Sequence, residues 1–218
     1  MKKQLVIAFI LFTLLTTITF KEKIIISRLN IKEIIVENNS LVKKKDVKKL
    51  LIPIYNKNII FLDNKEIEKA LTQNSFIETF DVKKKYPQNL KIRIFEKKPI
   101  AILLNKKKKF YLSDKIELIE FENIKKYQDL PYVFGNRDDF KIFYNDLKKI
   151  NFPFDLISKY TLYESKRWDL ETTDKIVIKL HSKNYLKNIN NYLDSRNKQN
   201  FKKYKIFDYR INNQLILK

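Results

Sequence analysis

The stretch from Phe80 to Ala101 constrains the fold most, because hydrophobic and basic residues alternate along it on both sides of a turn-forming segment. Hydrophobic residues such as Val82 and Leu90 lie beside Lys, the period-2 pattern of strands that bury one face. The Tyr-Pro-Gln-Asn segment between them suits a chain reversal, since Pro fixes φ and Asn tolerates positive φ. We therefore expect a β-hairpin with a cationic face in water. Glu96 and Pro99 would close its second strand, because Pro cannot donate to a β-ladder.

The residues before this hairpin predict a strand followed by two amphipathic helices. Ser40 could cap the first helix, Pro53 would help to end it, and Asp63 or Asn64 would cap the second. The hydrophobic positions behind these predictions are Ile31, Ile34 and Val36 for the strand, Val47, Leu50, Leu51 and Ile54 for the first helix, Ile59, Ile60 and Leu62 for a connection that returns to the core, and Ile67, Ala70 and Leu71 for the second helix.

An uncharged segment runs from Leu5 to Phe20, with Lys2 and Lys3 before it and Lys21 after it. A bilayer core takes about 20 apolar residues and about 17 is the short limit, so the segment is close to the length of a membrane anchor. A cleaved signal peptide is the alternative, but no small-x-small cleavage site follows the apolar run. We favour an uncleaved anchor with its basic N-terminus in the cytoplasm and the bulk of the chain outside it.

The composition argues against catalysis. The chain has no Cys, a single His at position 181 and a single Gly at position 135, which leaves no thiolate chemistry, no His-based metal site and no glycine-rich phosphate loop. Two carboxylate pairs, Asp138 with Asp139 and Asp169 with Asp174, are expected to cap helices or lie in turns. We therefore predict no enzyme activity, no metal site and no cofactor.

The net charge of +21 raises the possibility of a partner that is a nucleic acid or an anionic lipid. However, the Lys runs are dispersed and Lys greatly outnumbers Arg, whereas base and phosphate recognition favours Arg. Abundant Lys, Ile, Asn, Phe and Tyr are also what an AT-rich coding sequence would give. The charge is therefore attributed mainly to solvated surfaces.

After Pro99 the pattern changes to a series of short strands with two helices, one around Phe140 to Ile150 and one around Tyr185 to Arg196. We expect an antiparallel sheet with the helices packed on it. The expected strand segments are 100–104, 110–112, 116–119, 160–163, 166–170, 176–180, 204–208 and 214–218.

The order strand, helix, helix, strand, strand resembles a POTRA domain, and its details are similar to the FtsQ/DivIB family of cell division proteins. The resemblance covers residues 5–218 and implies an α+β protein with three parts: a cytoplasmic stub and transmembrane helix over 1–23, a POTRA domain over 29–98 and an FtsQ-type β domain over 99–218. The motifs that carry it are Ile31-x-x-Ile34-x-Val36, Val82-Lys-Lys-Lys-Tyr-Pro87, Glu96-Lys-Lys-Pro99-Ile-Ala101, Leu130-Pro131 to Gly135, Arg167-Trp168 and Asp208-Tyr209-Arg210-Ile211. In the last of these the family has Leu and Tyr at the positions of Tyr209 and Ile211.

The resemblance implies a non-enzymatic divisome scaffold of the inner membrane at the septum, with most of the chain in the periplasm. It implies partners of the FtsB and FtsL type and a link to the septal peptidoglycan synthases. An alternative is a POTRA-containing export or assembly factor, although the strands after Pro99 lack the apolar outer band of a membrane barrel.

The final strand is the expected binding site, because a strand at a sheet edge has unpaired N–H and C=O groups that a partner strand can use. The other reading is an edge that Lys218 and nearby Lys residues protect. By the resemblance, arginines would pair with acidic residues of the partner and hydrophobic residues would line the contact. The implied partner-binding residues are Arg167, Arg210, Ile211, Gln214, Leu215, Ile216 and Leu217.

Overall fold

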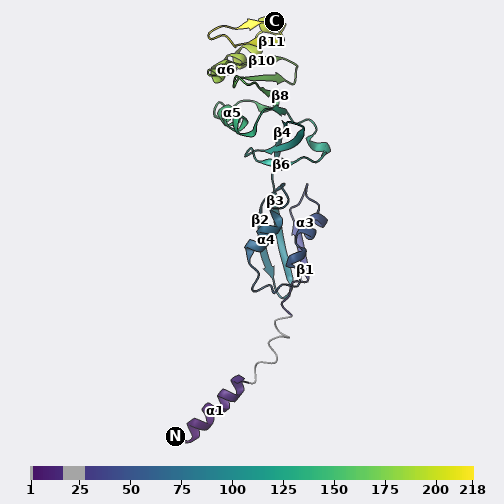
Figure 1. Cartoon of the computed structure of the whole chain (residues 1–218), viewed down its shortest axis with the longest axis vertical. Coiled ribbons are helices and arrows are strands. Elements are labelled where there is room, and N and C mark those ends of the chain that lie inside the picture. Colours follow the sequence, from purple (N-terminus) through teal and green to yellow (C-terminus); the bar gives the residue numbers. More distant parts are fainter. Residues whose placement is uncertain (1, 17–27) are drawn as a thin grey trace. The chain divides into compact units, whose positions relative to one another are not determined.

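The structure is a computed structural model that describes residues 2–16 and 28–218 (Figure 1). It divides into two compact units, Met1–Lys97 and Lys98–Lys218, each of which is described by itself. Helix α1, Lys2–Thr16, covers most of the expected anchor, and the remainder, residues 17–23, lies outside the described residues. Within the described ranges, no helix has both the length and the hydropathy needed to cross a bilayer.

The first unit contains a three-stranded sheet of order β1-β3-β2 in the described residues. Strand β1 (Glu33–Glu37) runs parallel to β3 (Asn89–Glu96), which pairs antiparallel with β2 (Ile77–Lys85). Between β1 and β2 lie α3 (Lys44–Leu50), a 3-10 turn η2 (Ile52–Ile54) and α4 (Asn64–Leu71). The predicted hairpin and the predicted order of elements are confirmed, with a core that the hydrophobic faces of all five elements share.

The helix caps are confirmed in part. Asp63 caps α4, where its Oδ1 accepts from the N–H of Lys65 at 3.0 Å. Ser40 does not cap α3, which begins after Lys43 with no side-chain cap. The N–H of Ser40 instead donates to the carboxylate of Glu96, which the loop 40–42 surrounds. One core prediction is also wrong: Ile60 is 49% exposed, while its neighbour Ile59 is fully buried.

The second unit contains a nine-stranded sheet in the described residues, of order β12-β11-β10-β9-β8-β7-β4-β5-β6. Helix α5 (Arg137–Lys149) follows β7 and α6 (Tyr185–Arg196) follows β10. The strands are β4 (Pro99–Asn105), β5 (Lys108–Ser113), β6 (Leu118–Glu120), β7 (Tyr132–Phe134), β8 (Ile157–Leu162), β9 (Trp168–Thr172), β10 (Val177–Lys179), β11 (Ile206–Asp208) and β12 (Ile216–Leu217).

The expectation of an antiparallel sheet is wrong, because the sheet is mixed. Strand β7 runs parallel to both β4 and β8, and β10 runs parallel to β11. Parallel neighbours need a crossover connection. Helix α5 is the crossover between β7 and β8, and α6 is the crossover between β10 and β11. Eight of the nine strands match expected segments, and β7 was not expected. Periodicity also does not state the direction of the neighbouring strand.

Both crossover helices bury their hydrophobic faces against the sheet. Phe140 and Phe143 of α5 lie against Trp168 of β9, and Phe143 stacks on it at 4.9 Å between ring centroids. Tyr192 of α6 meets Phe207 of β11 edge to face at 5.0 Å. These aromatic rings fill one face of the sheet. On the opposite face, β9 and β11 carry the polar residues Asp169 and Asp208, whereas at β4 to β6 that face is hydrophobic and buried, with Ile102, Tyr111 and Ile119.

Candidate functional site

The β12 strand is the last strand of its sheet, and within the described part of the chain β11 is its only strand partner. Ile206 and Lys218 exchange two backbone hydrogen bonds, of 2.9 and 3.1 Å. Hydrogen-bonded and non-hydrogen-bonded pairs alternate along an antiparallel ladder. The next pair, Phe207 with Leu217, is therefore non-hydrogen-bonded, and the N–H and C=O of Leu217 point away from β11.

The side chains of this edge divide between the two faces of the sheet. Leu215 and Leu217 are partly buried and pack on the core under the helices. Ile216 points to the opposite face and is 39% exposed. Leu215 and Leu217 therefore pack this edge against the core, while Ile216 and the outer backbone of β12 are available to a partner.

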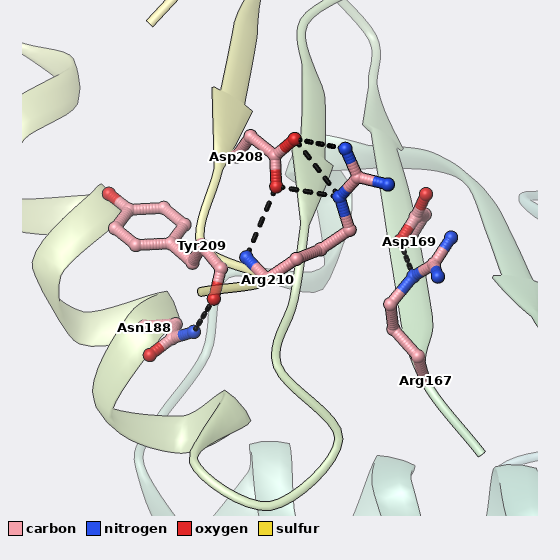
Figure 2. A network of polar contacts seen from close by, with 6 residues as sticks. All are labelled: Arg167, Asp169, Asn188, Asp208, Tyr209 and Arg210. Atoms are coloured by element: carbon pink, nitrogen blue, oxygen red, sulfur yellow. Dashed lines mark hydrogen bonds and ion pairs between the residues drawn. The ribbon is translucent and has the colours of Figure 1, made fainter. Parts of the chain in front are cut away.

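Two arginines on the polar face are each held by an aspartate two residues away (Figure 2). The Nε of Arg210 donates to both carboxylate oxygens of Asp208, at 2.8 and 3.0 Å, and Nη2 donates at 2.6 Å. The Nε of Arg167 donates to Asp169 at 3.0 Å, and its guanidinium lies 4.1 Å from the ring centroid of Tyr163. Each arginine is therefore fixed by a nearly buried carboxylate.

The strand register brings these pairs together. Lys179 of β10 lies opposite Asp169 on one side and Asp208 on the other, and Asp208 lies opposite Ile216. The four residues thus form one row across β9, β10, β11 and β12. Hydrogen bonds from Arg210, and then the charge of Lys179, lower the pKa of Asp208. The bond to Asp208 in turn raises the pKa of Arg210, so both groups are charged near neutral pH.

The structure therefore brings together part of the predicted site. Arg167, Arg210 and Ile216 share the polar face, whereas Leu215 and Leu217 face the core. Ile211 and Gln214 lie outside the strands, in the exposed turn between β11 and β12, where the N–H of Gln214 donates to the C=O of Ile211 at 3.2 Å.

Sequence reasoning missed three members of this group, Asp169, Lys179 and Asp208. Asp169 was expected in a cap or turn, but it lies within β9, while Asp174 does lie in a turn. A signal was present, because Arg167-x-Asp169 and Asp208-x-Arg210 have the spacing that puts two strand side chains on one face. The part of the chain that the structure describes contains no group of three or more His, Cys, Asp or Glu side chains placed to hold a metal ion.

Comparison with known proteins gives consistent matches. A family model described as "POTRA domain, FtsQ-type" matches residues 29–97. "Cell division protein FtsQ" of Rickettsia bellii is 27% identical over 172 residues, which are 78% of this chain and 64% of that protein. The protein of the same name from Rickettsia conorii is 26% identical over 189 residues, 84% of this chain and 70% of that protein.

Among solved structures, the chain is similar to the major extracytoplasmic domain of the cell division protein DivIB from Geobacillus stearothermophilus. The two share 16% sequence identity with a TM-score of 0.32, over 48% of this chain and 99% of that one.

Proposed function

Because the chain belongs to the FtsQ/DivIB family of cell division proteins, we propose that it is a non-enzymatic scaffold that binds other division proteins. The observation that carries this proposal is the free edge of β12. A strand whose outer N–H and C=O groups have no partner is a template for a strand from another protein. Among the described residues, the outer backbone groups of Leu217 have this property.

We propose FtsB-type and FtsL-type proteins as the partners, with septal peptidoglycan synthases downstream. The added strand would lie beside β12, next to Ile216, with Asp208 of β11 as the nearest member of the polar row. Main-chain bonds would supply affinity, and the side chains beside them would supply specificity.

The arginines would recognise acidic residues of that partner. The side chain of Arg210 is 45% exposed, and its Nη1 makes none of the hydrogen bonds to Asp208. A guanidinium has five N–H donors, so Arg210 can keep Asp208 and still bind a second carboxylate. Arg167 is more covered, at 22% exposure, and contributes less accessible surface.

The proposal includes a single-pass position in the inner membrane, with the N-terminus in the cytoplasm and the two units in the periplasm. Its support is the uncharged run from Leu5 to Phe20 behind a basic start. An anchored scaffold would keep the β12 edge close to partners that are held in the same membrane.

Replacing Leu217 by Pro tests the edge. Because the N–H of Leu217 points away from β11, Pro removes an outer donor and adds ring bulk without removing a bond to β11. One main-chain hydrogen bond contributes about 0.5–1.5 kcal/mol and the ring also obstructs the approaching strand, so we expect the Kd for the FtsB-type protein to rise at least ~10-fold. The measurement is a titration of the purified full chain with that protein.

Leu217→Ala is the matched control, since it removes the same side chain but keeps the N–H. We expect its Kd to stay within about threefold of the wild-type value, because most of the Leu217 side chain faces away from the proposed partner. Equal Kd values for the Pro and Ala variants would show that the outer backbone of β12 makes no contact with the partner.

A further inference from the structure

One end of the POTRA domain gathers three segments, Arg28–Ile31, Lys57–Leu62 and Tyr86–Gln88, which we call the POTRA N-terminal end. The N–H of Ile31 donates to Lys57 and the N–H of Ile59 donates to Leu29, both at 2.9 Å. The side chain of Gln88 donates to the C=O of Arg28 at 3.0 Å. In Figure 1 this is the end of the unit at which β1 starts.

This end exposes large apolar and aromatic side chains. Phe61 is 77% exposed, Tyr86 62% and Ile60 49%. Single exposed hydrophobic residues are ordinary, but an exposed group of this kind at one end of a small domain indicates a surface that meets another apolar phase.

The exposure of Ile60 and Phe61 is imposed by the backbone of their loop. Ile59 and Leu62 on either side of them are buried. The Nζ of Lys84 donates to the C=O groups of Ile60 and Leu62, each at 3.1 Å, and the N–H of Ile60 donates to Asn58 at 2.9 Å. The loop cannot turn Ile60 and Phe61 toward the core without breaking these three hydrogen bonds.

Basic side chains accompany the apolar ones at this end. The cationic residues at this end and beside it are Arg28, Lys32, Lys57, Lys84 and Lys85, and the acidic residues near them are Glu33, Asp63 and Glu66. One acid is already used, since Lys57 and Glu66 form an ion pair at 2.7 Å. Exposed aromatic and apolar side chains favour the interface of a bilayer, and basic side chains beside them are attracted to anionic headgroups.

The chain itself limits how far this end can lie from a bilayer. Seven residues, 21–27, separate the apolar run ending at Phe20 from Arg28. Eight steps of a fully extended chain reach at most about 29 Å. This step rests on the membrane anchor of the proposed function, and it applies to the POTRA N-terminal end because Arg28 belongs to it.

We propose that the POTRA N-terminal end is a membrane-contact surface, in which Phe61 and Ile60 enter the headgroup region of an anionic bilayer. Tyr86 lies at the interface, and the basic side chains contact lipid phosphates. The contact fixes the orientation of the POTRA domain on the membrane and so limits the positions from which partners can approach it.

The absence of Cys allows a direct test, since one introduced Cys is a unique labelling site. We would place an environment-sensitive fluorophore at Tyr86→Cys in the full chain, reconstituted in vesicles of phosphatidylglycerol with phosphatidylethanolamine. We expect the emission of this fluorophore to shift to shorter wavelength and to be quenched by spin-labelled lipid. Both effects should fall by more than half when Ile60→Ser and Phe61→Ser are added. The control label is Lys45→Cys in the first turn of α3, an exposed site on a different segment, which should stay at its aqueous wavelength.

An aqueous emission at position 86 in these vesicles, an equal shift at position 45, or a shift unchanged by the two Ser substitutions would each overturn the proposal. Flotation of the chain with neutral phosphatidylcholine vesicles tests the anchor separately. Flotation without a shift at position 86 refutes the contact surface alone. A shift in anionic vesicles without flotation in neutral ones supports the contact surface and refutes the anchor.

Discussion

At the residue scale, two Arg–Asp ion pairs determine the chemistry of the polar face, each joining a strand aspartate to an arginine just beyond the strand end. Asp208 is only 5% exposed, and a buried carboxylate without a partner destabilises a protein. Its bonds to Arg210 therefore stabilise the folded state, in addition to any role in partner binding. The same holds for Asp169 with Arg167. Substituting either arginine therefore changes both binding and stability, and the two effects have to be measured together.

Asp208→Asn separates the fold from the partner. It keeps the shape but removes the charge that accepts from Arg210, and we expect the free energy of unfolding at pH 7 to fall by about 1–3 kcal/mol. Because folding lowers the pKa of Asp208, its contribution is complete above the unfolded pKa of about 4 and is lost as the pH falls through the lower folded pKa. The difference between wild type and variant in urea unfolding should therefore shrink below about pH 4.

Asp138→Asn is the control for this series, since the side chain of Asp138 is 78% exposed and its ion pair is with the neighbouring Arg137. We expect a change of less than about 0.5 kcal/mol at every pH. A loss at Asp208 that is no larger than the loss at Asp138 would contradict the structural role of the Asp208–Arg210 pair.

Individual strands and helices were largely predictable from the sequence, whereas the long-range hydrogen bonds at their ends were not. The residues of α5 repeat at helical spacing, and Asn136 accepts from the N–H of Asp139 at 2.8 Å to cap the helix. At α3, by contrast, the carboxylate of Glu96 at the end of β3 accepts from the backbone of Ser40, Leu41 and Val42. No local pattern marks such a contact, since Glu96 lies more than fifty residues from this loop.

Glu96→Ala tests this contact between β3 and the loop before α3. The change leaves three backbone N–H groups without their acceptor, so we expect the free energy of unfolding to fall by about 1–3 kcal/mol. Amide hydrogen exchange should accelerate at residues 40–42 in particular. Glu164→Ala, at an exposed turn, is the matched change and should have little effect; exchange at 40–42 that is equal in both variants would exclude the role given to Glu96.

The two units of the whole molecule have separate cores, and the candidate site belongs to the second unit alone. Each unit is large enough to be stable by itself, at roughly 0.05–0.15 kcal/mol per residue. Partner binding at β12 should therefore depend on the packing of α5 and α6 and be insensitive to the first unit.

Phe143→Ala tests this independence. Phe143 is buried and stacks on Trp168, so the change should cost about 3–5 kcal/mol in the second unit. Hydrogen exchange should then accelerate in β8 to β12 and remain unchanged in β1 and β3. Ile142→Ala, the exposed neighbour on the same helix, serves as control, and acceleration in both units with Phe143→Ala would show that they unfold together.

The sequence alone determined most of the segments that become strands or helices and most of the faces that are buried, because these properties repeat every two or 3.6 residues along the chain. The short strand β7 was not among them. It also marked Arg167, Arg210 and Ile216 as residues of interest. Only the tertiary structure decided that the sheet is mixed, that Asp169, Lys179 and Asp208 lie in one row, and that the outer groups of Leu217 face away from β11. These facts depend on the direction and register of strands far apart in sequence, which long-range packing sets and local periodicity does not encode.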